Sequence, residues 1–119
     1  MNAPMVPKID NYRFGNIVID GKQFTSDVII YPDRVEGPWW REEGHSLALS
    51  DLPAELGDPP QVLVIGQGCY GRMDVPPKTR RYFQEAGVEL ILEKTAQACE
   101  TYNRLREVKR VVAALHLTC

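Results

Sequence analysis

The hydrophobic pattern of the chain changes character at about residue 61. From there on, a continuous apolar run at Val62–Ile65 is followed by two further strand-like segments at Val88–Leu92 and Val111–Leu117, and stretches with helical periodicity separate them. The run at Val62–Ile65 is typical of a strand that is buried on both faces of a parallel sheet. This half of the chain therefore predicts a β-α-β-α-β unit, in which right-handed crossovers join parallel strands.

Two helices are predicted between these strands. Pro76–Pro77 suits the start of the first helix, because a proline in the first turn loses only an N–H that has no helical partner, and Gly87 is the expected terminator. Its buried face is expected to comprise Thr79, Tyr82, Phe83 and Ala86. Thr95 is the expected N-cap of the second helix. The buried stripe of that helix is expected to comprise Ala98, Cys99, Tyr102 and Leu105.

The first half of the chain predicts an N-terminal antiparallel β meander. Tyr12–Asp20 alternates imperfectly, Asp20–Gly21 is a strong hairpin signal, and Asp27–Tyr31 is a second β-type run. Residues 1–11 are expected to form an irregular N-terminal arm, and residues 12–119 a single domain. The predicted fold is a compact layered α/β (α+β mixed) domain. It has a central mixed sheet and two helices, and the meander extends that sheet or covers one of its faces.

Composition and charge narrow the classes of function. The chain has 119 residues, a net charge of −2 and no apolar run near the length of a membrane helix, so neither nucleic acid nor a membrane is an expected partner. The three cysteines, Cys69, Cys99 and Cys119, are far apart and form no CxxC motif, which indicates neither a zinc site nor a disulfide framework. No secretory or mitochondrial presequence pattern is visible. We expect a cytoplasmic protein without a metal or a cofactor.

The loop after the first buried strand has the spacing of a dinucleotide-binding motif, with Gly66, Gly68 and Gly71. In a true dinucleotide site the helix begins inside the motif and meets the pyrophosphate. Here the helix cannot begin much before Pro76, which argues against that ligand. The N–H groups of the loop, with Arg72 beside them, could still form an anion-binding nest. The competing interpretation is that these glycines only permit turns with positive φ beside the sheet edge.

Cys69 lies in this loop, at the end of a strand where open α/β sheets place their sites. A nucleophilic cysteine needs a base nearby, and the chain has two histidines, His45 and His116. His116 ends the last predicted strand and could reach the same sheet edge. Its apolar flanks favour a structural role, however, and Cys69 is read more simply as a loop residue. No catalytic residue is predicted.

A dense segment contains Trp39, Trp40, Arg41 and His45. These side chains could line a pocket or contact a partner, although the favoured interpretation is that they cover the open end of the sheet. In Leu47–Leu56, which follows, Ser50 or Asp51 could cap a single helical turn that contains Pro53. The acidic residues, Asp27 among them, show no spacing that indicates an acid/base pair or a metal site.

Six short motifs occur together in order along the chain. They are Phe14-Gly-x-Ile17 with Asp20-Gly21; Asp27 to Pro32; Trp39-Trp40-Arg41 with Gly44-His45; Val64-Ile-Gly66-x-Gly68; Thr95-x-x-Ala98 with Tyr102-Asn103; and Ala114-x-His116-x-Thr118-Cys119. With these motifs the chain resembles the Mth-938-like domain family over roughly residues 12–119. The positions that match the family pattern are Trp40, Arg41, Gly44, His45, Gly66, Gly68, Thr95, Asn103 and His116.

The resemblance implies the layered fold described above and no established reaction or cofactor. The best-described members of the family are accessory or assembly proteins, including an assembly factor of mitochondrial complex I. The expected function is therefore a non-catalytic protein-binding or accessory module, whose partner is another protein or a further copy of this chain. The alternative is a protein, catalytic or not, that binds a small molecule or an anion through Gly66–Arg72 with Cys69, His45 or His116.

Overall fold

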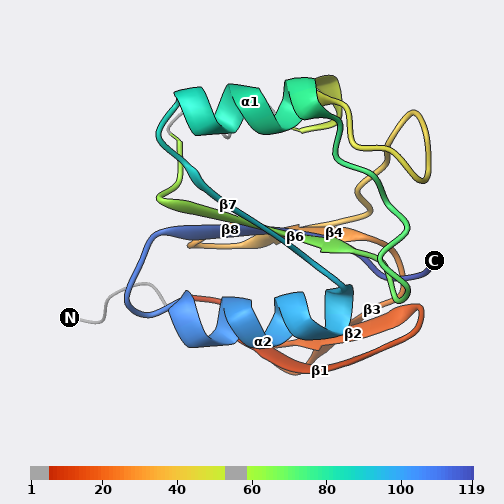
Figure 1. The fold of residues 1–119 in the computed structure, drawn as a ribbon. Helices are drawn as coiled ribbons and strands as arrows, with labels where there is room; N and C mark the ends of the chain where they lie inside the picture. Colours follow the sequence, from red (N-terminus) through yellow and green to blue (C-terminus); the bar gives the residue numbers. More distant parts are fainter. Residues whose placement is uncertain (1–5, 53–58) are drawn as a thin grey trace.

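The computed structural model describes residues 6–52 and 59–119 (Figure 1). Within these ranges the chain forms eight β-strands, two α-helices and a short 3₁₀ helix. The strands are β1 (Ile9–Arg13), β2 (Asn16–Ile19), β3 (Lys22–Phe24), β4 (Val28–Ile30), β5 (Val35–Glu36), β6 (Val62–Gln67), β7 (Glu89–Glu93) and β8 (Val111–His116). The helices are η1 (Leu49–Asp51), α1 (Pro77–Glu85) and α2 (Thr95–Leu105).

Two sheets divide the described strands between them. The larger sheet has the order β5-β4-β8-β6-β7, with β6 parallel to both β7 and β8 and β4 antiparallel to β8. The smaller sheet has the order β1-β2-β3 and is antiparallel throughout. Figure 1 shows α1 on one face of the larger sheet, and α2 with the smaller sheet on the other. The predicted β-α-β-α-β unit is thus confirmed, and its sheet is mixed as expected.

The three central strands of the larger sheet, β4, β8 and β6, are buried almost throughout, as the apolar run at Val62–Ile65 predicts for β6. Along β6, Val62 and Val64 pack into one core with α2 and the smaller sheet, whereas Leu63 and Ile65 pack into a second core with α1. Alternation along a strand sends neighbouring side chains to opposite faces, so both faces of β6 need apolar residues. Among the described helices, none is both long enough and apolar enough to cross a membrane.

The first half of the chain differs from the predicted meander in two ways. The strand β1 begins at Ile9, inside the segment expected to be an irregular arm. A turn at Phe14–Gly15 divides Tyr12–Asp20 into two strands, whereas the hairpin at Asp20–Gly21 is confirmed, with φ values of 50° and 78°. The expectation that the first half extends the central sheet or covers one of its faces is confirmed, because β4 and β5 extend the larger sheet and β1, β2 and β3 form the second sheet. All of β4 is buried, which suits its position beside β8.

The helices follow the expected boundaries, with two corrections. In α1, Thr79 and Phe83 are buried but Tyr82 is exposed, so its buried face is narrower than predicted. Thr95 is not an N-cap, because it is the first residue of α2 and its hydroxyl bonds other elements. The stripe of Ala98, Cys99 and Tyr102 is buried as predicted, and Leu105 packs against it. A short 3₁₀ helix, η1, is formed by Leu49–Asp51, whereas the helical turn expected to contain Pro53 lies outside the described ranges.

Candidate functional site

A buried ionic cluster forms where β8 ends beside the start of β4. His116 is the last residue of β8, Asp27 immediately precedes the antiparallel neighbour β4, and Arg41 comes from the segment after β5. The Asp27 Oδ2 atom lies 2.8 Å from His116 Nδ1 and 3.0 Å from Arg41 Nη1. The Arg41 Nη2 atom lies 3.0 Å from His116 Nδ1 and donates to the Gly44 carbonyl at 3.1 Å. Three distant segments therefore meet in one set of contacts, which we call the Asp27 cluster.

Burial and charge fix the protonation of the Asp27 cluster. The exposed fractions of the side chains are 4% for Arg41, 8% for His116 and 16% for Asp27. Burial alone would raise the pKa of Asp27, but hydrogen bonds from His116 and from the Leu117 N–H, together with the charge of Arg41, lower the pKa below its ordinary value. The carboxylate is therefore ionised at neutral pH. An ionised carboxylate accepts hydrogen bonds only, so we assign the Nδ1 proton of His116 to its bond with Asp27.

Three nitrogen atoms of the cluster are buried without a hydrogen-bond partner in the described part of the chain: Nε2 of His116, and Nε and Nη1 of Arg41. Of these, Arg41 Nη1 is ion-paired with Asp27 at 3.0 Å, which leaves His116 Nε2 and Arg41 Nε with no polar contact among the described residues. With the proton on Nδ1, Nε2 of a neutral His116 is an acceptor, whereas Nε of Arg41 is a donor. A buried polar atom without a partner costs about 1–3 kcal/mol. A small polar group that reached either atom would therefore gain a hydrogen bond.

The glycine loop beside the cluster is packed closely against its neighbours. Gly66 lies within β6, where a Cβ atom would come 2.9 Å from the Thr95 Oγ1 atom. Gly68 has a φ of +95°, and a Cβ atom there would lie 2.7 Å from the Thr118 carbonyl and 2.9 Å from the His116 ring. Glycine is thus required at these positions for close approach, and at Gly68 for backbone conformation as well.

The loop does not present a free row of N–H groups to an anion. The Gly68 N–H donates to Thr95 Oγ1 at 2.9 Å, the Cys69 N–H donates to the Thr118 carbonyl at 2.8 Å, and the Gly71 N–H donates to the Gly68 carbonyl at 3.2 Å. The Arg72 guanidinium lies 5.6 Å from the centre of the exposed Tyr70 ring. Three N–H groups of the proposed anion-binding nest are therefore already bonded within the protein. These contacts agree with the other interpretation, in which the glycines permit turns and close packing.

The sequence-predicted Cys69 and His116 are not joined as a nucleophile and its base. The Tyr12 hydroxyl donates to the Leu117 carbonyl at 2.9 Å. Burial, followed by the effect of Cys69, raises the pKa of Tyr12 to about 12. His45 does approach the cluster: its Nε2 atom lies 2.7 Å from the Cys119 carbonyl, and its ring packs edge-on at 6.4 Å from the His116 ring.

The two tryptophans have different environments. Trp39 is buried, its Nε1–H donates to the Asp51 carbonyl at 2.9 Å, and the Arg41 guanidinium lies 4.7 Å from its ring centre. Trp39 therefore covers the cluster, as the lid interpretation predicted for this segment. Trp40, the residue proposed for a site, is 78% exposed.

Three exposed aromatic side chains stand on loops that meet at the end of β8. Next to Phe14, the Gly15 N–H donates to the Leu117 carbonyl at 2.9 Å. Next to Tyr70, the Cys69 N–H donates to the Thr118 carbonyl at 2.8 Å. Trp40 is joined to the same end through the contact of Arg41 with His116. In Figure 1 the turn after β6 and the segment after β5 reach the same end of the molecule as residue 119. We call Phe14, Trp40 and Tyr70 the aromatic rim.

Sequence reasoning missed Asp27 and Tyr12 as parts of this end of the sheet. Asp27 meets His116 across 89 positions of sequence, so no local spacing could reveal the pair. The available signal was a single carboxylate directly before a fully apolar strand, where a charged group has to find a partner. Among the described residues, no group of three or more His, Cys, Asp or Glu side chains could hold a metal ion.

The comparisons with known proteins point to one family. Residues 9–116 match the family model described as protein of unknown function (DUF498/DUF598). The solved structure of the conserved hypothetical protein PH1505 from Pyrococcus horikoshii has 32% sequence identity and a TM-score of 0.81, and the match covers 94% of this chain and 99% of that one. A Bordetella parapertussis protein has 28% identity and a TM-score of 0.77, covering 98% and 99% of the two chains. A Bordetella pertussis protein described as a Mth938-like domain shares the fold with 23% identity and a TM-score of 0.69, covering 98% and 89%.

Proposed function

This chain belongs to the DUF498/DUF598 family of proteins of unknown function, and we propose that it acts as a non-catalytic, protein-binding accessory module. The observation that carries the proposal is the aromatic rim. Trp40, Tyr70 and Phe14 are exposed large aromatic residues on loops that converge on the end of β8. Tryptophan and tyrosine are enriched among the residues that dominate binding energy at protein interfaces.

The rim rests on a base that is already ordered. Arg41, next to Trp40, is ion-paired and buried, and Cys69, next to Tyr70, is hydrogen-bonded through its backbone to Thr118. A preorganised aromatic surface loses little conformational entropy when a partner covers it. Covering Trp40, which is 78% exposed, would remove roughly 150 Å² of mostly apolar surface and contribute about 4 kcal/mol. A rim of this kind suits docking.

The partner we expect is another protein, or a further copy of this chain, that offers an apolar pocket to Trp40. The three cysteines are free thiols, which supports the expectation of a reducing, cytoplasmic setting.

The test compares Trp40→Ser with Val108→Ser. Val108 has a similar exposed fraction, 73%, and lies beyond the other end of α2, so its replacement controls for the loss of apolar surface as such. Tagged protein at native concentration should recover a stoichiometric partner, or light scattering should show a dimer, and Trp40→Ser alone should abolish the association. Recovery of no stoichiometric partner by a monomeric protein, or equal loss in both variants, would overturn the proposal.

A second candidate function is the binding of a small polar molecule at the Asp27 cluster. Its support is the pair of unpartnered atoms, His116 Nε2 and Arg41 Nε, in the part of the chain that the structure describes. The ¹⁵N signal of His116 Nε2 should then shift saturably when acetate or acetamide is added as a probe. An unchanged His116 signal with both probes would remove this candidate.

A further inference from the structure

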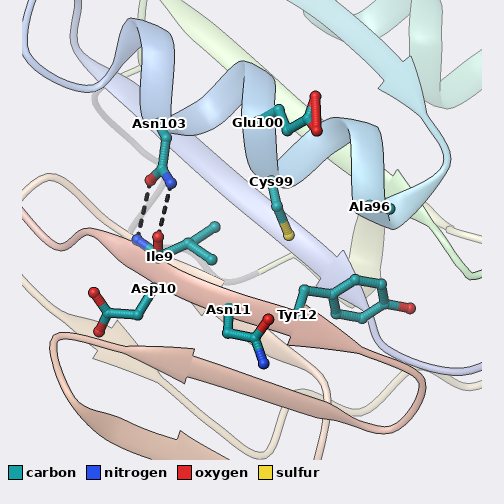
Figure 2. A pocket seen from close by; sticks show the side chains of 8 residues that line it. All are labelled: Ile9, Asp10, Asn11, Tyr12, Ala96, Cys99, Glu100 and Asn103. Carbon is teal, nitrogen blue, oxygen red and sulfur yellow. Dashed lines mark hydrogen bonds between the residues drawn. The ribbon is translucent and has the colours of Figure 1, made fainter.

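The strand β1 is the outer strand of the smaller sheet, and part of its free edge is bonded by α2. The Asn103 side chain donates from Nδ2 to the Ile9 carbonyl at 2.7 Å and accepts at Oδ1 from the Ile9 N–H at 3.0 Å (Figure 2). One side-chain amide thus occupies the place that the peptide groups of a neighbouring strand would take. The edge of β1 is therefore capped at Ile9.

After Ile9, the next residue of β1 with outward-pointing backbone groups is Tyr12. In an antiparallel pair, alternate residues turn both their backbone groups away from the partner strand. Ile9, opposite Ile19, is one such residue, as its bonds to Asn103 show. The register then shifts by one residue before Asn11, so Tyr12, opposite Ile17, is the next residue to turn its N–H and C=O outward. Outward groups of an edge strand are a template for pairing with another chain.

A cavity of about 310 Å³ lies between this edge and α2. Figure 2 shows the Tyr12 ring on β1 and the Cys99 sulfur, which extends from α2 toward the strand. The volume is near the lower limit of ligand pockets, about 300 Å³, so the cavity suits one long side chain better than a large ligand. The charged residues that line it, Asp10 on the strand and Glu100 on the helix, are both acidic.

We call this cavity between β1 and α2 the groove. Its side chains are suited to binding and not to covalent chemistry. Burial, together with the nearby Glu100, raises the pKa of the Cys99 thiol to about 12, so the thiol remains protonated and a poor nucleophile. The Asp10 carboxylate accepts a hydrogen bond from the Gly21 N–H at 2.7 Å, which holds it toward the turn between β2 and β3. A cationic side chain would complement the charge of the two carboxylates.

We propose that the groove between β1 and α2 binds an extended peptide segment of another protein, which pairs with β1 at Tyr12 and places a lysine or arginine side chain near Asp10 and Glu100. In such strand addition the backbone bonds provide affinity and the side-chain pocket provides specificity. This groove is a second surface, and its use does not depend on the aromatic rim.

The test uses three probes and ¹⁵N amide shifts of the whole chain. The probes are a capped pentapeptide with a central lysine between valines and outer threonines, the same peptide with a central glutamate, and N-acetyl-lysine amide. The lysine peptide should shift the amides of β1 and α2 saturably, and it should bind at least threefold more tightly than either other probe. The absence of saturable shifts, or equal binding of the lysine and glutamate peptides, would overturn the proposal. Equal binding of N-acetyl-lysine amide would do so as well, because it would identify a cation pocket without strand recognition.

Three variants complete the test. Glu100→Gln should weaken binding of the lysine peptide at least threefold, and Ala96→Phe, at an exposed position that lines the groove, should abolish it. Glu85→Gln, an exposed position on α1, is the control and should change nothing. Trp40→Ser should also leave peptide binding intact, so failure of the groove and failure of the aromatic rim can be told apart. Equal effects of Glu100→Gln and Glu85→Gln would exclude the charge recognition proposed here.

Discussion

The Asp27→Asn substitution removes the negative charge around which the buried cluster is built. The Arg41 side chain, 4% exposed, would then be buried without a counter-ion, next to His116, which has also lost its acceptor. Removing one partner of a buried pair costs about 3–5 kcal/mol, and because asparagine can still accept from the Leu117 N–H, we expect about 3 kcal/mol. A domain of this size has a free energy of unfolding of roughly 5–15 kcal/mol, so the loss would be a large fraction of the total.

The assay is urea unfolding at neutral pH, followed by tryptophan fluorescence. With a urea dependence of about 2 kcal/mol per molar, the midpoint should fall by about 1.5 M. The control is Asp33→Asn, which breaks the exposed ion pair with Arg34 (2.9 Å; side chains 39% and 62% exposed) and should cost less than about 1 kcal/mol.

The double variant Asp27→Asn/Arg41→Met separates the missing bond from the stranded charge. If most of the cost comes from the unpaired guanidinium, removing Arg41 as well should recover part of the stability that Asp27→Asn alone loses. A midpoint for Asp27→Asn equal to that of Asp33→Asn would refute the reasoning. A double variant would refute it as well if its loss of stability equalled the sum of the losses of Asp27→Asn and Arg41→Met measured separately.

Three further predictions concern the ionisation of Asp27, the backbone at Gly68 and the reactivity of Cys99. Because the folded pKa of Asp27 lies below its ordinary value of 3.8, its contribution to stability is present above pH 3.8 and is lost as the pH falls through the lower folded pKa; acid unfolding followed by circular dichroism should show this loss in the native sequence and not in Asp27→Asn. Gly68→Ala should destabilise the fold by about 1–3 kcal/mol more than Gly87→Ala, because both glycines have positive φ but only Gly68 would place a Cβ atom 2.7 Å from a carbonyl; equal urea midpoints for the two variants would contradict this. Burial raises the pKa of the Cys99 thiol to about 12, so Cys99 should resist alkylation in the folded protein while the partly exposed Cys69 reacts. Mass spectrometry of the labelled peptides measures the order of reaction, and labelling of Cys99 before Cys69 would contradict the prediction.

The second half of the chain could be predicted from its sequence because its signals are local. Continuous apolar runs separated by Pro76–Pro77 and by Gly87 determine β6, α1 and β7 almost residue by residue. The division of the first half between two sheets could not be predicted in the same way. The runs that became β2 and β4 are both short and apolar, and what separates them is the partner each finds, β1 or β8, far along the chain.

The candidate site shows the same limit more sharply. Arg41, His45 and His116 were all singled out from the sequence, yet the carboxylate that joins two of them, Asp27, was not. A threonine before a helix has the appearance of an N-cap in any sequence. Only the fold shows that the Thr95 hydroxyl instead links Gly68 to the His116 carbonyl.

The position of β8 has a consequence for the order in which the chain can fold during synthesis. β8 lies between β4 and β6, and the residues after it receive bonds from Gly15, Tyr12 and Cys69. The larger sheet therefore cannot close, and the smaller sheet cannot dock against it, until the ribosome has released residues 111–119. A nascent chain that stops at residue 110 should remain open to protease, and resistance of that chain would show that the earlier elements can fold without their central strand.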